Sequence, residues 1–361
     1  ILQGTDYKKY SFRSNVNTSF LNDKLKIAAN ISGYVGNQTD LVDGTEATLA
    51  RVVQMHPTVV AKMEGYGWTS WFYNDAVRDA GGKKGLDKKS FTGNINAIFQ
   101  ITKQLKLEGA VSYDYNMEFG QTYAPNVTLY TIETGSNGEQ TIGKNTSRES
   151  MIRESTYRYG TLSSYATLSY WMNIDEDHHF KVLGGTQQSD WDGKYYQTER
   201  RRLTADLPTL EVGDPATQKN SAWASNVRSL SLFGRFNYDY KNKYLFEANM
   251  RHDGSSKFAI DNKWGLFPSF SAGWRISEEP FLKKSLPWVN ELKIRGSWGQ
   301  LGNEKIWSSY AGIDILSVGT TNYIWNKQSM TGAAVSYIAN KDLTWETTTQ
   351  QNLGLDFTIF N

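Results

Sequence analysis

The sequence contains no cysteine, so disulfides, thiolate metal ligands and cysteine nucleophiles are excluded. It also has no apolar run of about 18 residues, and its mean hydropathy is −0.56, so a bundle of membrane-spanning helices is excluded as well. Neither sign of charge dominates, because 39 lysines and arginines are balanced by 37 acidic residues scattered along the chain. We therefore expect no nucleic acid partner.

Aromatic residues are abundant, with 12 tryptophans, 21 tyrosines and 16 phenylalanines. At 14% of 361 residues, this composition is too rich in ring surface for a disordered chain. The chain opens at Ile1 without a methionine, a basic segment or an apolar leader. We expect it to be a processed product or a piece of a longer polypeptide.

Alternation with a period of two residues is the clearest pattern in the sequence. Over Leu105–Tyr115, and again over Leu230–Tyr240, one set of alternate positions is apolar, aromatic or glycine and the other is mostly polar or charged. Such alternation predicts strands with one apolar face and one polar face. A strand of about 11 residues spans about 25 Å when tilted near 45°, which is the height of the apolar band of an outer-membrane barrel.

Nine further segments alternate in the same way, so we expect eleven strands. The nine are 10–20, 25–35, 91–101, 162–172, 180–188, 244–250, 267–276, 292–298 and 353–359. Short turns are expected near 22–24, 102–104, 174–178 and 241–243, with a longer one, including a possible helical turn, over Ser277–Glu291. Long polar connections run over 36–90, 116–153, 189–222 and 299–345.

Short turns at one end and long loops at the other are typical of outer-membrane barrels. We therefore expect an all-β fold, a transmembrane antiparallel β-barrel segment over 1–361 in which the long connections are extracellular. A soluble β-sandwich would also alternate. The strand length and the tyrosines and tryptophans near strand ends favour the membrane.

Four linked motifs lie between Asn249 and Asn303, in the sequence NMRHDGSSKFAIDNKWGLFPSFSAGWRISEEPFLKKSLPWVNELKIRGSWGQLGN. This segment resembles the SusC/RagA family of TonB-linked outer-membrane transporters. The motif residues are Arg251, Asp253, Gly254, Ser255, Ser256, Phe258, Trp264, Pro268, Gly273, Trp274, Arg275, Trp298 and Asn303. From their types we interpret them as architectural: Arg251 and Asp253 as a charge pair closing a strand, Gly254–Ser256 as its turn, and Gly273 and Gly296 as relief of crowding between strands.

The resemblance implies a barrel of roughly 22 strands, of which this chain holds about half. It implies TonB-dependent import of a nutrient, either an oligosaccharide (glycan) or a peptide, with a SusD-like surface lipoprotein as lid. TonB would act through a plug domain that we do not find in this sequence. The resemblance also implies contact with outer-membrane lipid, and it leaves open whether two copies of the transporter complex associate as a higher-order dimer. The location implied is the outer membrane of a Gram-negative bacterium.

Two other functions remain open: a passive outer-membrane porin or adhesin without energy coupling, and an outer-membrane hydrolase. The hydrolase lacks support, because no nucleophile elbow, phosphate-binding glycine loop or placed carboxylate pair occurs. Four histidines, at 56, 178, 179 and 252, give no pattern of metal ligands. We expect no enzymatic activity, no metal and no cofactor.

Aromatic side chains in the long connections are the remaining binding candidates. Flat rings with polar tips can stack on sugar faces or on peptide side chains. The candidates are Tyr66, Trp68, Trp71, Tyr73, Trp191, Tyr195, Tyr196, Trp307, Tyr310, Tyr323 and Trp325, with Phe72 and Trp223 beside them. The alternative for each is packing between loops or against the lid partner.

Overall fold

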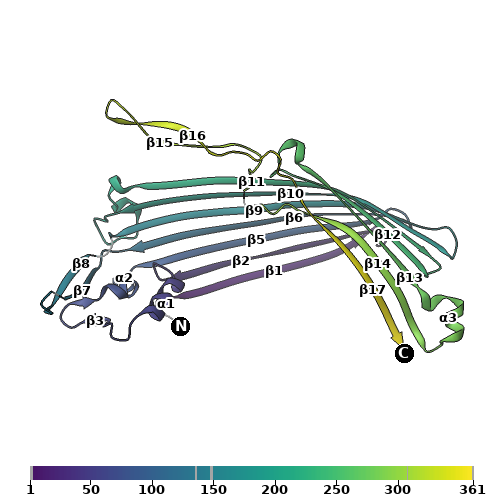
Figure 1. Cartoon of the computed structure of the whole chain (residues 1–361), viewed down its shortest axis with the longest axis horizontal. Helices are drawn as coiled ribbons and strands as arrows, with labels where there is room; N and C mark the ends of the chain where they lie inside the picture. Colours follow the sequence, from purple (N-terminus) through teal and green to yellow (C-terminus); the bar gives the residue numbers. More distant parts are fainter. Residues whose placement is uncertain (1–2, 135, 147–148, 307, 360–361) are drawn as a thin grey trace.

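The computed structural model describes residues 3–134, 136–146, 149–306 and 308–359, and its main feature is one curved antiparallel sheet (Figure 1). Each strand except the last pairs with the sheet strand that follows it along the chain, in the order β1-β2-β5-β6-β9-β10-β11-β12-β13-β14-β17. The strands are β1 (Asp6–Phe20), β2 (Leu25–Asp40), β5 (Lys83–Gln100), β6 (Leu105–Ala124), β9 (Met151–Asn173), β10 (His178–Arg201), β11 (Lys219–Tyr240), β12 (Tyr244–Ser255), β13 (Trp264–Arg275), β14 (Val289–Asn303) and β17 (Glu346–Ile359). Among the residues that the structure describes, no helix is long and apolar enough to cross a bilayer.

All eleven expected strands are present, but the strands extend further into the long connections than expected. β2 ends at Asp40 and β5 begins at Lys83, so the first connection is 41–82 rather than 36–90. The other three shorten to 125–150, 202–218 and 304–345. Hydrophobic alternation marks only part of each strand, because the backbone hydrogen-bond ladder continues after both faces become polar.

Two of the short turns contain residues with positive φ. Asn22 and Asp23 adopt φ of 54° and 63° between β1 and β2, and Lys241 and Asn242 adopt 56° and 54° between β11 and β12. Asparagine and aspartate reach this left-handed region more easily than most residues. The end of the sheet that carries these turns is called the turn end below. It also carries the expected helical turn, α3 (Pro280–Ser285), after the 3₁₀ turn η5 (Ile276–Glu278).

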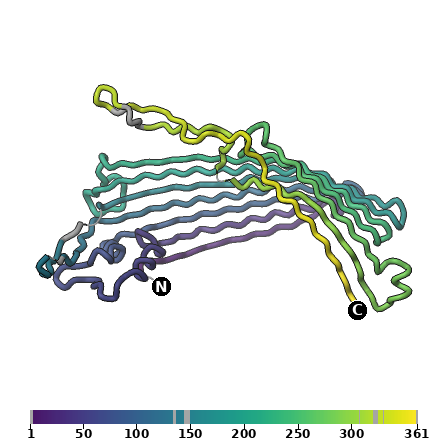
Figure 2. Tube along the Cα trace, in the orientation of Figure 1, coloured from purple at the N-terminus to yellow at the C-terminus, as the bar shows by residue number. Residues whose placement is uncertain are grey.

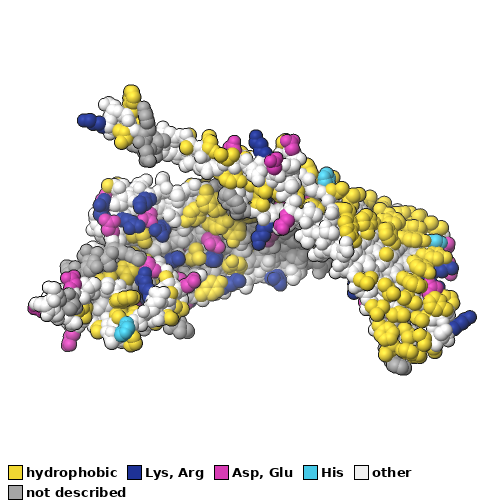
Figure 3. Space-filling model, viewed as in Figure 1, with side chains coloured by type: hydrophobic (Ala, Val, Ile, Leu, Met, Phe, Trp, Pro, Cys, Tyr) yellow, Lys and Arg dark blue, Asp and Glu magenta, His cyan; other side chains and the backbone are white. Residues whose placement is uncertain are grey.

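The two faces of the sheet differ in polarity. The outer face is apolar over the part of the sheet nearer the turn end, where Val111, Leu232 and Phe246 are among many exposed hydrophobic side chains. Figure 3 shows hydrophobic side chains gathered over the surface around β12–β14. The inner face carries hydrogen-bonded polar groups, such as Glu108, which accepts from the Tyr165 hydroxyl at 3.0 Å.

Aromatic side chains border the apolar outer face at the turn end. Tyr240 stacks on Tyr244 at 6.2 Å between ring centroids, and Tyr244 stacks on Trp274 at 6.4 Å. Glu279 accepts hydrogen bonds from the Tyr244 hydroxyl at 2.7 Å and from Trp274 Nε1 at 3.2 Å. The bond from Tyr244, followed by that from Trp274, holds the pKa of Glu279 below its usual value. A girdle of this kind marks a membrane interface.

At the opposite, loop end, the first two connections pack together. They form α1 (Thr45–Gln54), β3 (Lys62–Met63), β4 (Gly67–Trp68), η1 (Ser70–Phe72), α2 (Tyr73–Asp79), β7 (Thr128–Thr134) and β8 (Gln140–Thr146). Their shared core contains Tyr73, Val77 and Leu129, and it rests on Ala124 at the end of β6. The third connection contains η2 (Leu210–Val212) and η3 (Pro215–Thr217), and η4 (Ile260–Asn262) lies between β12 and β13.

The last long connection forms a separate hairpin. Its strands β15 (Ile315–Trp325) and β16 (Gln328–Tyr337) make a two-stranded sheet of their own and project beyond the large sheet (Figure 1). Figure 2 shows the two ends of the chain at the opposite edges of the large sheet, where β1 and β17 each have one neighbour. All 15 residues of β1 are exposed.

Candidate functional site

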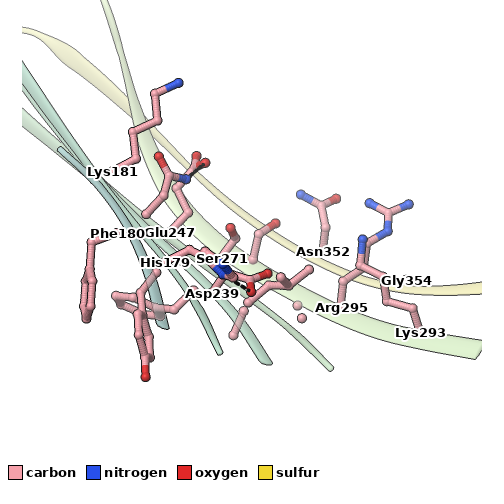
Figure 4. A pocket seen from close by; sticks show the side chains of 18 of the residues that line it. His179, Phe180, Lys181, Asp239, Glu247, Ser271, Lys293, Arg295, Asn352 and Gly354 are labelled. Atoms are coloured by element: carbon pink, nitrogen blue, oxygen red, sulfur yellow. Dashed lines mark hydrogen bonds and ion pairs between the residues drawn. The ribbon is translucent and has the colours of Figure 1, made fainter. Parts of the chain in front are cut away.

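Two open clefts follow the inner face, and the first lies at the turn end. It has a volume of about 870 Å³ and is lined by residues of β9, β10, β11, β12, β13, β14 and β17. Figure 4 shows its charged and polar side chains, with His179 paired to Asp239 at 3.3 Å. Lys293 and Arg295 both contact Asp356, at 3.8 and 3.3 Å. Because positive and negative side chains are paired, this surface is hydrophilic but does not favour ligands of one charge.

The second cleft, of about 680 Å³, contains several motif residues. Arg251 contacts Asp253 at 2.7 Å and donates to Ser231 Oγ at 2.7 Å, and its guanidinium lies 5.6 Å from the centre of the Phe233 ring. Strand β12 continues through Asp253 to Ser255. The expected charge pair is therefore confirmed, but it lies within the strand and does not close it.

Phe267 and Trp345 line the second cleft, and Phe258 packs against Trp345. The ring of Trp345 lies 5.4 Å from Phe258 and 5.4 Å from Phe267, and its Nε1 donates to the Lys263 backbone oxygen at 3.0 Å. A Cβ at Gly302 would collide with the Phe267 ring. This contact ties the end of the last long connection to β13, and it explains the phenylalanines of two motifs.

The remaining motif residues hold strand ends and loops together. Ser255 is buried, Ser256 Oγ accepts from the Arg228 backbone nitrogen at 2.9 Å, and Asn303 donates to Glu346 at 2.9 Å. The ring of Trp264 packs against His252, and the ring of Trp298 packs against Phe270. Arg275 forms an ion pair with Glu291, Pro268 lies opposite Met250 on the neighbouring strand, and the Gly254 backbone lies against the Trp264 ring. A Cβ at Gly273 would lie 3.3 Å from Lys293, but one at Gly296 would lie 3.9 Å from its nearest neighbour, so the expected crowding at Gly296 is wrong.

An aromatic cluster lies on the inner face nearer the loop end. It consists of Tyr157 and Tyr159 of β9, Tyr195 of β10 and Trp223 of β11. Tyr157 lies 4.6 Å from Tyr159, 6.4 Å from Tyr195 and 5.5 Å from Trp223, and Tyr195 stacks on Trp223 at 6.1 Å. The cluster presents ring faces beside a polar wall, which suits sugar rings and peptide side chains alike.

A charged cluster lies beyond the aromatic one, at the loop end of β9 and β10. Glu199 has a side chain only 5% exposed, and it accepts from Arg153 at 2.6 and 2.8 Å and from Arg201 at 2.8 Å. Burial raises the pKa of Glu199, but the hydrogen bonds from Arg201 and Arg153 lower it by more, so that it stays ionised. The two arginines and Tyr73 also line a cleft of about 330 Å³ beneath the first connection.

The candidates from the first connection do not share one surface. Tyr73 is 5% exposed in the loop core, whereas Tyr66 and Trp71 are exposed. Trp68 stacks on Phe72 at 6.0 Å and donates to Asp79 at 3.2 Å, and Lys62 lies 4.2 Å from its ring centre. Tyr66 touches Tyr130 edge-on at 5.6 Å.

The later candidates are spread over two faces and a hairpin. The structure places Trp191, Tyr195 and Tyr196 in strand β10 rather than in a loop, with Tyr196 on the outer face beside the inner-facing Tyr195. Tyr310 accepts from the Asn226 backbone nitrogen at 3.1 Å, and Trp325 is exposed at the tip of the β15–β16 hairpin. Trp307 lies outside the described residues, and of Tyr323 only the backbone is described.

Comparison with known proteins decides the family. A family model described as "TonB dependent receptor-like, beta-barrel" matches residues 62–361. The chain belongs to this family. Its sheet is part of a transmembrane antiparallel β-barrel in the outer membrane of a Gram-negative bacterium, and the inner face described above lines the lumen of this TonB-dependent receptor barrel.

The TonB-dependent receptor chain is similar to SusC and to RagA-type proteins, as its motifs indicate. The "TonB-dependent receptor SusC" of Bacteroides thetaiotaomicron is 27% identical over 390 residues, which cover 100% of this chain and 37% of that protein. The "TonB-dependent receptor P26" of Formosa agariphila is 28% identical over 376 residues, covering 100% and 35%. The RagAB peptide transporter structure superposes with a TM-score of 0.78 at 22% identity, over 99% of this chain and 39% of that chain. This chain thus spans well under half the length of these relatives.

Sequence reasoning about the TonB-dependent receptor chain missed Tyr157 and Tyr159. Both fall between the expected loop 116–153 and the expected strand 162–172. A signal was present in the sequence. Tyr157, Tyr159 and Tyr165 are separated by even numbers of residues, so they would share one face if the expected strand began before residue 162. No such signal marked the charged cluster of Arg153, Glu199 and Arg201, because it depends on the pairing of two different strands, β9 and β10.

Proposed function

We propose that this chain forms part of the wall of a TonB-dependent importer that carries an oligosaccharide or a peptide through its lumen. The observation that carries the proposal is the inner-face cluster of Tyr157, Tyr159, Tyr195 and Trp223. Its rings lie beside hydrogen-bonding groups, such as Gln197, which accepts from the Tyr195 hydroxyl at 2.8 Å. A passing substrate would exchange water for ring contacts at several adjacent points.

The energy source and the lid are proposed on the same basis. The named relatives are TonB-dependent receptors, and the RagAB structure is named a peptide transporter. We propose that TonB acts through a plug encoded outside this segment and that a SusD-like lipoprotein covers the loop end. The connections 41–82, 125–150, 202–218 and 304–345 would then face the extracellular side. No catalytic step is proposed for this chain.

Adjacent tyrosines offer a matched test of the lumen site. Tyr195 faces the lumen and Tyr196 faces outward from the same strand. In cells producing the full-length protein, we expect Tyr195→Ala to weaken capture about five- to tenfold, since a ring contact of this kind contributes about 1 kcal/mol. We expect Tyr196→Ala to leave capture unchanged. The probes are a labelled maltooligosaccharide and a labelled octapeptide library, scored for cell-associated label.

Two further results would contradict the proposal. Equal capture by the Tyr195→Ala and Tyr196→Ala cells would remove the aromatic cluster from the substrate path. Undiminished uptake in cells lacking TonB would show that the barrel is passive, whatever the tyrosines do.

A further inference from the structure

Basic side chains mark the place where the apolar outer face ends at the loop end. On the outer face of β5, β9 and β11, the run of apolar side chains reaches Phe91, Leu162 and Leu230 toward the loop end. The first charged residues beyond them are Lys89, Arg158 and Arg228, respectively. The corresponding first charge on β10 is Asp190, which pairs with Arg228 at 3.6 Å. At the turn end the same face is bordered by the aromatic girdle.

Two of these outer cations, Lys89 and Arg158, share one row of the sheet with a third outer cation, Lys194 of β10. Lys89 lies opposite Met117, Met117 lies opposite Arg158, and Arg158 lies opposite Lys194. Directly opposite residues point to the same face. Neighbouring strands are about 4.8 Å apart, so the three Cα atoms lie within about 15 Å. Lys89, Arg158 and Lys194 are called the outer basic row below.

In the part of the chain that the structure describes, no acidic side chain forms an ion pair with the outer basic row. Within the described ranges, no carboxylate lies within 4.0 Å of any of its three cations, whereas Lys8 and Arg228 on the same face each pair with an aspartate. The nearest acids along the strands are Asp87, which accepts from Asn37 at 2.7 Å, and Asp192. Like charges directly opposite one another destabilise a sheet, as Arg158 and Lys194 are here. The arrangement therefore calls for an external anion.

Apolar side chains lie next to the row on its membrane side. Phe91 is two residues from Lys89, and it is exposed on the outer face together with Tyr113 and Leu162. Tyr113 stacks on Tyr115 at 6.3 Å, which extends this apolar surface. A free anion would make no use of it, but a lipid would place its headgroup on the cations and its acyl chains on the rings.

We propose that the outer basic row is a binding site for the phosphate group of an outer-leaflet lipid. Arg158 supplies the planar donor fork that matches phosphate, and the two lysines supply point charges on either side of it. The bound phosphate offsets the repulsion between Arg158 and Lys194. The site lies on the opposite face from the lumen cluster, so it does not depend on what the barrel transports.

The test uses the full-length protein in detergent with phosphorylated lipid A or with the same lipid after dephosphorylation. Native mass spectrometry counts the lipids retained. Each cation at such a surface contributes about a fivefold effect, so we expect Lys89→Gln, Arg158→Gln and Lys194→Gln together to weaken retention of the phosphorylated lipid about 100-fold. Retention of the dephosphorylated lipid is expected to be weak and equal in parent and variant.

The matched control is Lys181→Gln, which removes a lysine from the inner face of β10 and should retain lipid as the parent does. Millimolar inorganic phosphate should not displace the lipid; displacement would assign the row to free phosphate instead. Equal retention by the triple variant and Lys181→Gln would overturn the proposal.

A second measurement covers the case in which the triple variant does not fold. Lys194→Gln alone removes one like charge, so without phosphorylated lipid it should resist unfolding at least as well as the parent. A lower resistance there would show that Lys194 has a partner within the protein, which contradicts the proposal.

Discussion

At the scale of single residues, Glu199 shows how the loop end of the wall is held. Its carboxylate is almost fully buried between Arg153 and Arg201, which come from two paired strands. The folded-state pKa of Glu199 lies below its ordinary value of 4.5. The stabilisation is therefore complete above about pH 4.5 and is lost as the pH falls through the lowered pKa.

We expect Glu199→Gln to lower the free energy of unfolding by about 2 kcal/mol at pH 7, because two arginines lose charge-assisted hydrogen bonds. The difference between parent and variant should shrink well below pH 4. Urea unfolding followed by tryptophan fluorescence at both pH values measures this. A difference that stays constant with pH would mean that the Glu199 carboxylate is not the source.

At the scale of elements, the sequence was sufficient to identify every strand of the large sheet, and insufficient to find where the strands end. Strand β10 has 24 residues, about twice what an apolar band of about 25 Å requires. Beyond the band its outer positions include Asp190, Asp192 and Lys194, so hydrophobicity no longer separates the faces. Hydrogen bonding to β9 and β11 determines the remainder, and no single strand encodes that pairing.

Strand β6 permits a direct test of the two faces. Val111 points outward with 52% of its surface exposed, and its neighbour Ser112 points inward. We expect Val111→Arg to cost about 2 to 4 kcal/mol if the position is near the bilayer midplane, and Ser112→Arg to cost much less. Heat-modifiable gel mobility of the two variants in lipid compares them. Equal stability would reverse the assignment of faces.

At the scale of the whole molecule, the sites are assembled from distant parts of the chain. Phe258 and Phe267, both within the motif-bearing segment 249–303, meet Trp345, and Tyr157 meets Trp223. No local sequence pattern spans these separations. The motifs could therefore be recognised from the sequence, but their common cleft could not. The same holds for the aromatic candidates, because the sequence placed Tyr195 and Tyr196 together and the sheet separates them onto two faces.

In the last connection, residues 304–345, the β15–β16 hairpin projects away from the large sheet, whereas Trp345 packs against it. We expect replacement of residues 316–335 by a short glycine–serine linker to change the free energy of unfolding by less than about 1 kcal/mol, since β15 and β16 pair with each other and not with the large sheet. Trp345→Ala should cost about 3 kcal/mol, because its ring is packed between Phe258 and Phe267. Urea unfolding of both variants compares them; a large loss on hairpin removal would show that it supports the wall.

The large sheet preserves chain order from one edge to the other. Each turn-end hairpin is thus a continuous stretch of codons whose two outer neighbours are also adjacent in the gene. An in-frame duplication or loss of one hairpin would widen or narrow the wall by two strands without rerouting any other segment. Each surviving hairpin would retain its own register, because its two strands pair with each other through the same turn.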